Sequence, residues 1–301
     1  MNNLRLFFRL SRPPLLLIAA LGYFLGAGVA RYLGISIDWG MYWLGQVWLI
    51  LLQFVMHALN EYFELPVEHR NPGKTLLLGS SGVLELGKLP RPMALWASVA
   101  CALAAGLLTV LIIRGSSDSP ESLVVLLVLV LAGLVYSVPP LRLSASGYGE
   151  LVLSFFLAAL VPVFAFSLQE GELHRLLAMV TFPLVCFFLA LLLTIEFPDY
   201  ATDLKYEKTS LLLRLGWQRG IVMHNLLISG GFLLLVLAIM LGLPWRIALP
   251  IMTVLPVGVA QIWLLNRIGQ GIKPNWSLLL VLAVATFGLT SYFLSYGFWT
   301  H

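Results

Sequence analysis

Charged residues are scarce in this sequence. Asp, Glu, Lys and Arg account for 11% of its 301 residues, against 60% hydrophobic residues, and its mean hydropathy is +0.94. Because soluble domains carry roughly 25% charged residues, the composition excludes a soluble globular protein and indicates an integral membrane protein. The net charge of +4 is accounted for by the membrane orientation derived below, so it does not require a nucleic-acid partner.

Cysteines and interdomain linkers are also nearly absent. The two cysteines, Cys101 and Cys186, both lie in apolar segments, so we interpret them as small core residues and not as a disulfide or a metal-binding pair. No Pro- or Ser-rich linker divides the chain. Residues 1–301 are therefore expected to form one transmembrane domain.

Long apolar segments dominate what remains. A helix needs about 20 apolar residues to cross the hydrocarbon core, and nine nearly charge-free windows of this kind lie at residues 13–30, 40–60, 92–113, 122–141, 147–168, 176–195, 220–243, 247–265 and 276–299. The windows are continuous apolar runs without the period-2 alternation of barrel strands. The sequence therefore predicts an all-α bundle of nine transmembrane helices.

The basic residues predict the orientation of this bundle. With the N-terminus inside, 14 of the 18 Lys and Arg residues fall in inside segments, and the outside segments hold only Arg31, Arg114, Arg175 and Arg246. Basic residues are enriched in cytoplasmic loops, so the N-terminus is expected in the cytoplasm. A different number of spans would distribute the basic residues between the two sides without this contrast, so the distribution also supports nine spans.

Two clusters of acidic residues stand out, because the chain has only 14 acids. They follow the second and sixth windows, both on the predicted cytoplasmic side, and consist of Glu61, Glu64 and Glu68, and of Glu196, Asp199 and Asp203. Both clusters are spaced three and then four residues apart, which places side chains on one face of a helix. Pro66 and Pro198 would interrupt these helices.

Carboxylates this close together repel one another, and more strongly near a low-dielectric boundary. Mg²⁺ relieves the repulsion, since it prefers oxygen ligands and is typically held by one or two carboxylates together with substrate phosphates. Two clusters on one side of the bundle thus indicate two Mg²⁺ ions binding a diphosphate. Further positive charge would come from Arg70, Lys74, Arg142 and Lys208. The alternative is that the acids are simply solvated and balanced by nearby basic residues.

These motifs resemble those of the UbiA-type intramembrane prenyltransferases. The family's first motif, N-D-x-x-D-x-x-x-D, is similar to Asn60-Glu61-Tyr62-Phe63-Glu64 with Glu68, and its second, D-x-x-x-D, matches Asp199 and Asp203. The segments "RLSRPP" at 9–14 and "YSVPPLRL" at 136–143 also resemble family landmarks. The likeness covers nearly the whole chain. It departs from the family at the first motif, where glutamates replace all three aspartates.

The resemblance implies Mg²⁺-assisted transfer of an isoprenyl chain from a polyprenyl diphosphate to an aromatic acceptor, in a multi-pass cell (inner) membrane protein whose active face is cytoplasmic. Glu61, Glu64 and Glu68 would hold one Mg²⁺, and Asp199 and Asp203 the other. Asn60 would add a neutral oxygen ligand or orient the diphosphate. Lys208, Arg70 and Arg142 would bind phosphate oxygens, and Tyr136 would lie near the reacting centre.

The acceptor is less clearly indicated. Gln53, seven residues before Asn60, and "GYGEL" at 147–151 resemble the 1,4-dihydroxy-2-naphthoate branch of menaquinone synthesis, whereas His57 and "YSVPPLRL" are more like other branches. Gln53 and His57 are candidate acceptor contacts. The alternative for His57 is a satisfied polar group, which is the commoner role of a buried histidine, and the alternative for Tyr136 is an interfacial tyrosine.

Two other functions stay open at this stage. The glutamates of the first motif are compatible with a non-catalytic relative that binds isoprenoids. A transporter is a weaker alternative, because the ionisable groups of an ion path are expected at mid-depth, whereas these acids gather at one face.

Overall fold

The computed structural model describes residues 3–68, 83–84, 90–115, 120–206 and 209–301. Within these residues the fold is all-helical, without a strand. Its helices are α1 (Asn3–Leu10), α2 (Pro13–Tyr32), α3 (Trp39–Glu68), α4 (Arg91–Gly115), α5 (Pro120–Ser137), α6 (Gly149–Phe155), α7 (Val161–Glu170), α8 (Arg175–Glu196), α9 (Tyr200–Lys205), α10 (Leu211–Leu215), α11 (Trp217–Met240), α12 (Trp245–Met252), α13 (Leu255–Gly269) and α14 (Trp276–Thr300). Short turns η1 (Leu143–Ala145) and η3 (Phe197–Asp199) and a π-helical turn η2 (Phe156–Leu160) join some of them.

Each of the nine predicted windows coincides with a helix, but the described part of the chain has eight that are long and apolar enough to cross a membrane. Three of these are composite: α6, η2 and α7 form one span, α8 continues through η3 into α9, and α12 joins α13. The window at 122–141 is the exception. Its helix ends at Ser137, because Pro139 and Pro140 lack the backbone N–H groups that would extend it. The prediction of an all-helical membrane fold is confirmed.

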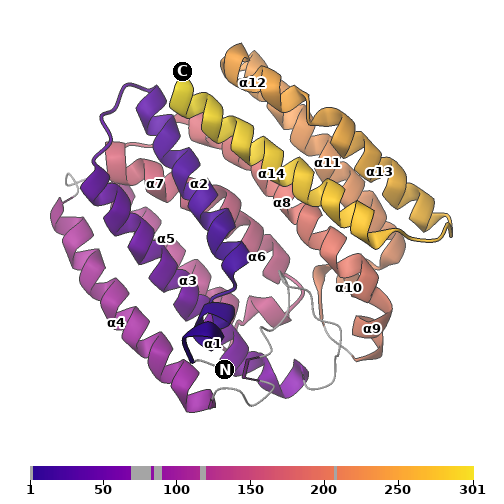
Figure 1. The fold of residues 1–301 in the computed structure, drawn as a ribbon, viewed down its shortest axis with the longest axis horizontal. Coiled ribbons are helices and arrows are strands. Elements are labelled where there is room, and N and C mark those ends of the chain that lie inside the picture. The colour runs from indigo at the N-terminus through magenta and orange to yellow at the C-terminus, as the bar shows by residue number, and fades with distance from the viewer. Residues whose placement is uncertain (1–2, 69–82, 85–89, 116–119, 207–208) are drawn as a thin grey trace.

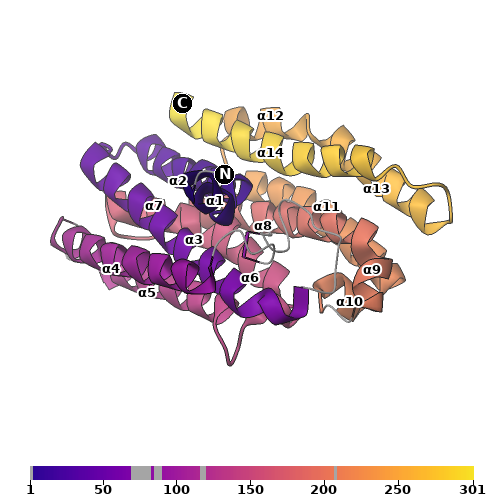
Figure 2. The ribbon, with the colours of Figure 1, turned by 60° about the horizontal axis from the view of Figure 1, so that its bottom comes forward.

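Helix α8 occupies the centre of the bundle. In its apolar window 78% of the residues are buried, against 17% in that of α4, which therefore lies at the periphery. Figure 2 shows α4 and α5 on the opposite side of the molecule from α12, α13 and α14. Large buried rings, among them Phe156, Phe164, Phe187 and Phe188, fill the space around α8. The described helices thus pack around one main apolar core, with two smaller apolar clusters beside it.

The ends of α3 and α8 carry the acidic motifs, and both lie at the lower end of the bundle in Figure 1, with α1, α9 and α10. We call this the motif end. The C-terminal end of α14 lies at the opposite end. Both acidic clusters therefore lie at one end of the bundle, as their predicted common side requires.

Candidate functional site

The first acidic motif forms the last turns of α3. The helix continues past Pro66 to Glu68, so this proline does not end it as expected. Asn60 and Glu61 are buried, at 2% and 1% exposure. The Glu61 Oε1 atom accepts hydrogen bonds from the backbone N–H groups of Val83 (3.2 Å) and Leu84 (3.1 Å). The first motif therefore holds part of the following loop.

The second acidic motif is not one continuous helix. Helix α8 ends at Glu196, and η3 carries Asp199 before α9 begins with Tyr200. The predicted break at Pro198 is thus confirmed. Asp203 is buried, whereas Asp199 is half-buried. Glu196 is buried too, and its Oε2 accepts the backbone N–H of Leu212 at 3.0 Å, which fixes the start of α10 to the end of α8.

Several predicted ligands lie outside the described residues. These are the whole residues Arg70, Lys74 and Lys208 and the side chains of Glu64 and Glu68. Among the side chains that are described, no three His, Cys, Asp or Glu residues form a metal-ligand group. The buried carboxylates of Glu61 and Asp203 still have the hard oxygen chemistry that suits Mg²⁺.

Two buried polar residues face the interior from α3, one turn apart. Gln53 and His57 are both fully buried, and neither the Gln53 amide nor the His57 ring nitrogens have a hydrogen-bond partner among the described residues. A buried polar atom left without a partner costs about 1–3 kcal/mol. Among the described residues, Gln53 and His57 therefore keep hydrogen-bonding capacity that no neighbouring side chain uses.

Arg12 is a further candidate site residue, one that the sequence predictions missed. It precedes α2 with φ of +52° and is only 4% exposed. Its Nε and Nη2 atoms have no partner in the described part of the chain, and its guanidinium lies within electrostatic range of His57. A positive φ is uncommon for a residue other than glycine. The available signal was "RLSRPP", in which Pro13 starts the helix and leaves Arg12 at its entry.

The loop after α5 brings Arg142 to the end of α3. Its Nη1 atom donates to the carbonyl oxygen of Phe63 at 2.8 Å, three residues after Asn60. Tyr136 is buried in the main core, at 4% exposure. Glu150, in the first turn of α6, is buried as well, and its Oε2 has no described partner.

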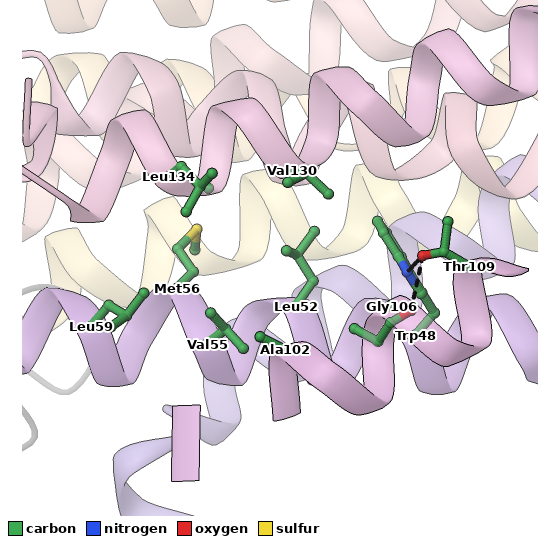
Figure 3. Close-up of a pocket in the computed structure, with 12 residues that line it drawn as sticks. Trp48, Leu52, Val55, Met56, Leu59, Ala102, Gly106, Thr109, Val130 and Leu134 are labelled. Carbon is green, nitrogen blue, oxygen red and sulfur yellow. Dashed lines mark hydrogen bonds between the residues drawn. The ribbon is translucent and has the colours of Figure 1, made fainter. Parts of the chain in front are cut away.

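An apolar cavity of about 320 Å³ lies on a different side of α3. It is lined from α3, α4 and α5 by residues that include Leu52, Met56, Gly106 and Leu134 (Figure 3). At one end, the Trp48 indole N–H donates to the Thr109 hydroxyl at 2.8 Å. None of the predicted site residues lines this cavity. It is therefore separate from the polar site formed by Gln53 and His57.

Residues 15–275 match the model of the UbiA prenyltransferase family. Comparison with curated proteins gives no significant match. The fold is similar over the full length of both chains to that of a digeranylgeranylglyceryl phosphate synthase, with a TM-score of 0.72 at 13% identity.

A UbiA homologue from Archaeoglobus fulgidus, solved with GPP and Mg²⁺, has a TM-score of 0.68 at 17% identity and matches over 97% of this chain and 98% of its own. A UbiA homologue from Aeropyrum pernix K1 gives 0.63 at 14% identity, over 96% and 98%. Since the family model spans most of the chain, this protein belongs to the UbiA prenyltransferase family.

Proposed function

We propose that this protein transfers an isoprenyl chain from a polyprenyl diphosphate to an aromatic quinone precursor, with 1,4-dihydroxy-2-naphthoate as the best candidate acceptor. The observation that carries the proposal is the pair of acidic motifs at one end of the bundle, with Glu61 and Asp203 buried. Carboxylate oxygens are the ligands that Mg²⁺ prefers, and it is typically held by one or two of them together with substrate phosphates. That a UbiA homologue was solved with GPP and Mg²⁺ supports the same chemistry here.

The diphosphate would bind at the motif end. The acidic motifs would hold Mg²⁺, which would supply the charge neutralisation that departure of the diphosphate needs, and two ions are expected because there are two motifs. The residues assigned to them are Glu61, Glu64, Glu68, Asp199 and Asp203. Asn60 orients the diphosphate or adds an oxygen ligand, and Arg70, Lys74, Arg142 and Lys208 provide positive charge.

Departure of the diphosphate leaves an allylic cation that must be protected from water. The apolar core around α8 supplies such an environment. Tyr136, buried at the motif-proximal end of α5, presents an aromatic ring that attracts cations through its negative face. We assign Tyr136 the role of stabilising this cation until the acceptor carbon attacks and loses its proton.

The acceptor would bind to Gln53 and His57. Both side chains can donate and accept hydrogen bonds, which matches the hydroxyl groups of a dihydroxy aromatic. Arg12 beside them offers only donors and a permanent positive charge, which matches a carboxylate. A dihydroxynaphthoate carries both kinds of group. The proposed subsite therefore uses the buried polar atoms that have no described partner.

Orientation and location follow from the basic residues. The segments predicted to lie inside hold 14 of the 18 Lys and Arg residues, and both acidic motifs belong to those segments. We therefore place the motif end on the cytoplasmic side of the cell membrane, where the diphosphate substrate would be available.

A transfer assay in nanodiscs tests the proposal. Radiolabelled geranylgeranyl or farnesyl diphosphate is offered with dihydroxynaphthoate, hydroxybenzoate, homogentisate or glyceryl phosphate acceptors, with and without Mg²⁺. A Mg²⁺-dependent prenylated naphthoate product supports the proposal. Product with another acceptor would support prenyltransferase activity but contradict dihydroxynaphthoate as the acceptor.

A second candidate function is a non-catalytic isoprenoid-binding protein. The first motif favours it, because it has three glutamates and Glu61 already binds the backbone of Val83 and Leu84. Binding of the labelled diphosphate without transfer to any acceptor would select this alternative. Absence of diphosphate binding would contradict both functions.

A further inference from the structure

A buried polar cluster crosses four helices in the C-terminal half of the bundle. It consists of Thr194 on α8, His224 on α11, Gln261 on α13 and Thr286 on α14, each at most 2% exposed. None of these residues belongs to the acidic motifs. In an apolar bundle such side chains bond across helices, so the cluster joins four elements at one point.

The hydrogen bonds of this cluster have a defined direction. Asn225 Nδ2 donates to Asn266 Oδ1 at 2.7 Å, which leaves Asn225 Oδ1 as the acceptor for His224 Nδ1 at 3.1 Å. His224 Nδ1 therefore carries the proton, and its Nε2 accepts from Gln261 Nε2 at 2.7 Å. The chain thus fixes one tautomer of His224.

The Gln261 carboxamide is fixed in the same way. Its Oε1 lies 3.1 Å from the Thr286 hydroxyl, whose one proton is shared with the carbonyl oxygen of Leu282 at 2.9 Å, and its Nε2 lies 3.4 Å from the Thr194 hydroxyl. Turning the amide over would place its oxygen against the unprotonated Nε2 of His224. Gln261 is therefore the residue through which α8, α11 and α14 are held to α13.

The cluster lies directly beneath the second acidic motif. The ring of Phe197, the first residue of η3, packs edge-on against His224 with centroids 6.5 Å apart, and against Trp217 at 5.3 Å. Asp199 ends η3, and Thr194 lies in the last two turns of α8. Phe197 therefore packs against His224 at the point where the chain turns from α8 towards Asp199 and Asp203. The hydrogen bond between Gln261 and Thr194 fixes the end of α8 nearby.

We propose that Gln261 and His224 are positioning residues that set the geometry of Asp199 and Asp203 for binding Mg²⁺ and diphosphate. The inference rests on the proposed function. Residues that orient metal ligands typically contribute 10–100-fold to metal affinity or activity, and here the orientation would pass through Phe197 and the backbone of η3. A cluster that only stabilised the bundle would leave the affinity for Mg²⁺ unchanged in the folded protein.

Four variants in nanodiscs test the proposal. Gln261→Leu and His224→Phe break the cluster, and Thr286→Val removes one hydroxyl while keeping the side-chain shape, in case the larger changes prevent folding. Thr290→Val is the matched control, since the buried Thr290 hydroxyl donates within α14 to the carbonyl oxygen of Thr286. Mg²⁺-dependent binding of radiolabelled geranylgeranyl diphosphate is measured for each, together with transfer kinetics and thermal unfolding.

For Gln261→Leu and His224→Phe, we expect the Mg²⁺ concentration giving half-maximal diphosphate binding to rise by about tenfold. The KM for the acceptor should stay within about twofold, and Thr286→Val should give a smaller rise. Thr290→Val should change neither quantity.

Unchanged Mg²⁺ dependence in the folded variants, with the wild type binding normally, overturns the positioning role and leaves the proposed function intact. An equal rise in Thr290→Val overturns it as well. If the wild type itself binds no diphosphate with Mg²⁺, the proposed function fails, and the inference fails with it.

Discussion

Glu61 holds Leu84: the buried carboxylate near the end of α3 accepts the backbone N–H of Leu84 at 3.1 Å, together with that of Val83. At the end of α8, the buried carboxylate of Glu196 accepts the backbone N–H of Leu212 at 3.0 Å. In both places an acid at the motif end binds the chain segment that follows its helix. Acidic residues here have an architectural role in addition to their proposed one.

The two roles of Glu61 can be separated by substitution. Glu61→Gln retains an oxygen that accepts the N–H groups of Val83 and Leu84 but removes the charge, so we expect little change in stability and a loss of Mg²⁺-dependent transfer. Glu61→Ala leaves both N–H groups without this acceptor and should lower the free energy of unfolding by about 1–3 kcal/mol. Thermal unfolding and transfer assays of both variants check this. Full activity in Glu61→Gln would contradict the assignment of Glu61 as a Mg²⁺ ligand.

Gln53 should matter for binding and not for stability. Because its amide has no described partner, Gln53→Leu breaks no hydrogen bond within the described protein and should leave the free energy of unfolding unchanged or raise it by about 1 kcal/mol. The acceptor KM should rise about three- to tenfold, since a lost hydrogen bond is worth about 0.5–1.5 kcal/mol. Steady-state kinetics and thermal unfolding provide the measurements.

The matched control for Gln53→Leu is Ser98→Ala. The buried Ser98 hydroxyl on α4 donates to Ala94 O within its own helix, away from the polar site. This variant should leave the acceptor KM unchanged. A clear loss of stability in Gln53→Leu would show that Gln53 has a structural partner.

Asp203 should be needed for the dependence on Mg²⁺. Asp203→Asn keeps the size of this buried side chain but removes its charge, so we expect transfer to fall on the order of 100-fold and the Mg²⁺ requirement to shift upward. Chelation with EDTA should abolish wild-type transfer, and added Mg²⁺ should restore it. The control is Asp38→Asn, because Asp38 caps the opposite end of α3 through the N–H of Met41. Equal losses in both variants would contradict a specific role for Asp203.

Two glycines should respond oppositely to alanine. A Cβ at Gly106 on α4 would meet nothing within 4 Å, so Gly106→Ala should raise the free energy of unfolding by about 0.5–1 kcal/mol, the difference in helix propensity. A Cβ at Gly26 on α2 would overlap the backbone carbonyl of Pro162 on α7. Gly26→Ala should therefore separate α2 from α7 and destabilise the protein. Thermal unfolding of both variants measures these opposite effects. Equal stability of the two variants would contradict the prediction.

The secondary structure was largely predictable because membrane helices follow local rules. Apolar windows locate the spans, since a helix satisfies its own backbone hydrogen bonds in lipid. The deviations have local causes as well: Pro139 and Pro140 end α5 before the predicted boundary, and Pro198 separates α8 from α9. Pro66, by contrast, lies within α3, where the sequence rule predicted an interruption.

The candidate site was only partly predictable. The spacing of the acids indicated both motifs, and Gln53 and His57 were candidates, but spacing could not show that their polar atoms have no partner among the described residues. Arg12 was missed because arginines near the first span are normally counted towards membrane orientation. The cluster of His224, Gln261, Thr194 and Thr286 was also missed, since its members come from four helices and their hydrogen bonds span up to 67 positions.

The sequence alone therefore determined that the chain is a helical membrane protein, approximately where its spans lie, and which acids face a common end. These properties depend on hydropathy and on spacing within one helix. Only the tertiary structure decided which buried polar atoms have hydrogen-bond partners among the described residues. It also decided that Glu61 accepts hydrogen bonds from Val83 and Leu84 and Glu196 from Leu212, and that Phe197 packs against His224. Such relationships depend on how separate helices pack, and contacts between helices are not encoded in the period of any one of them.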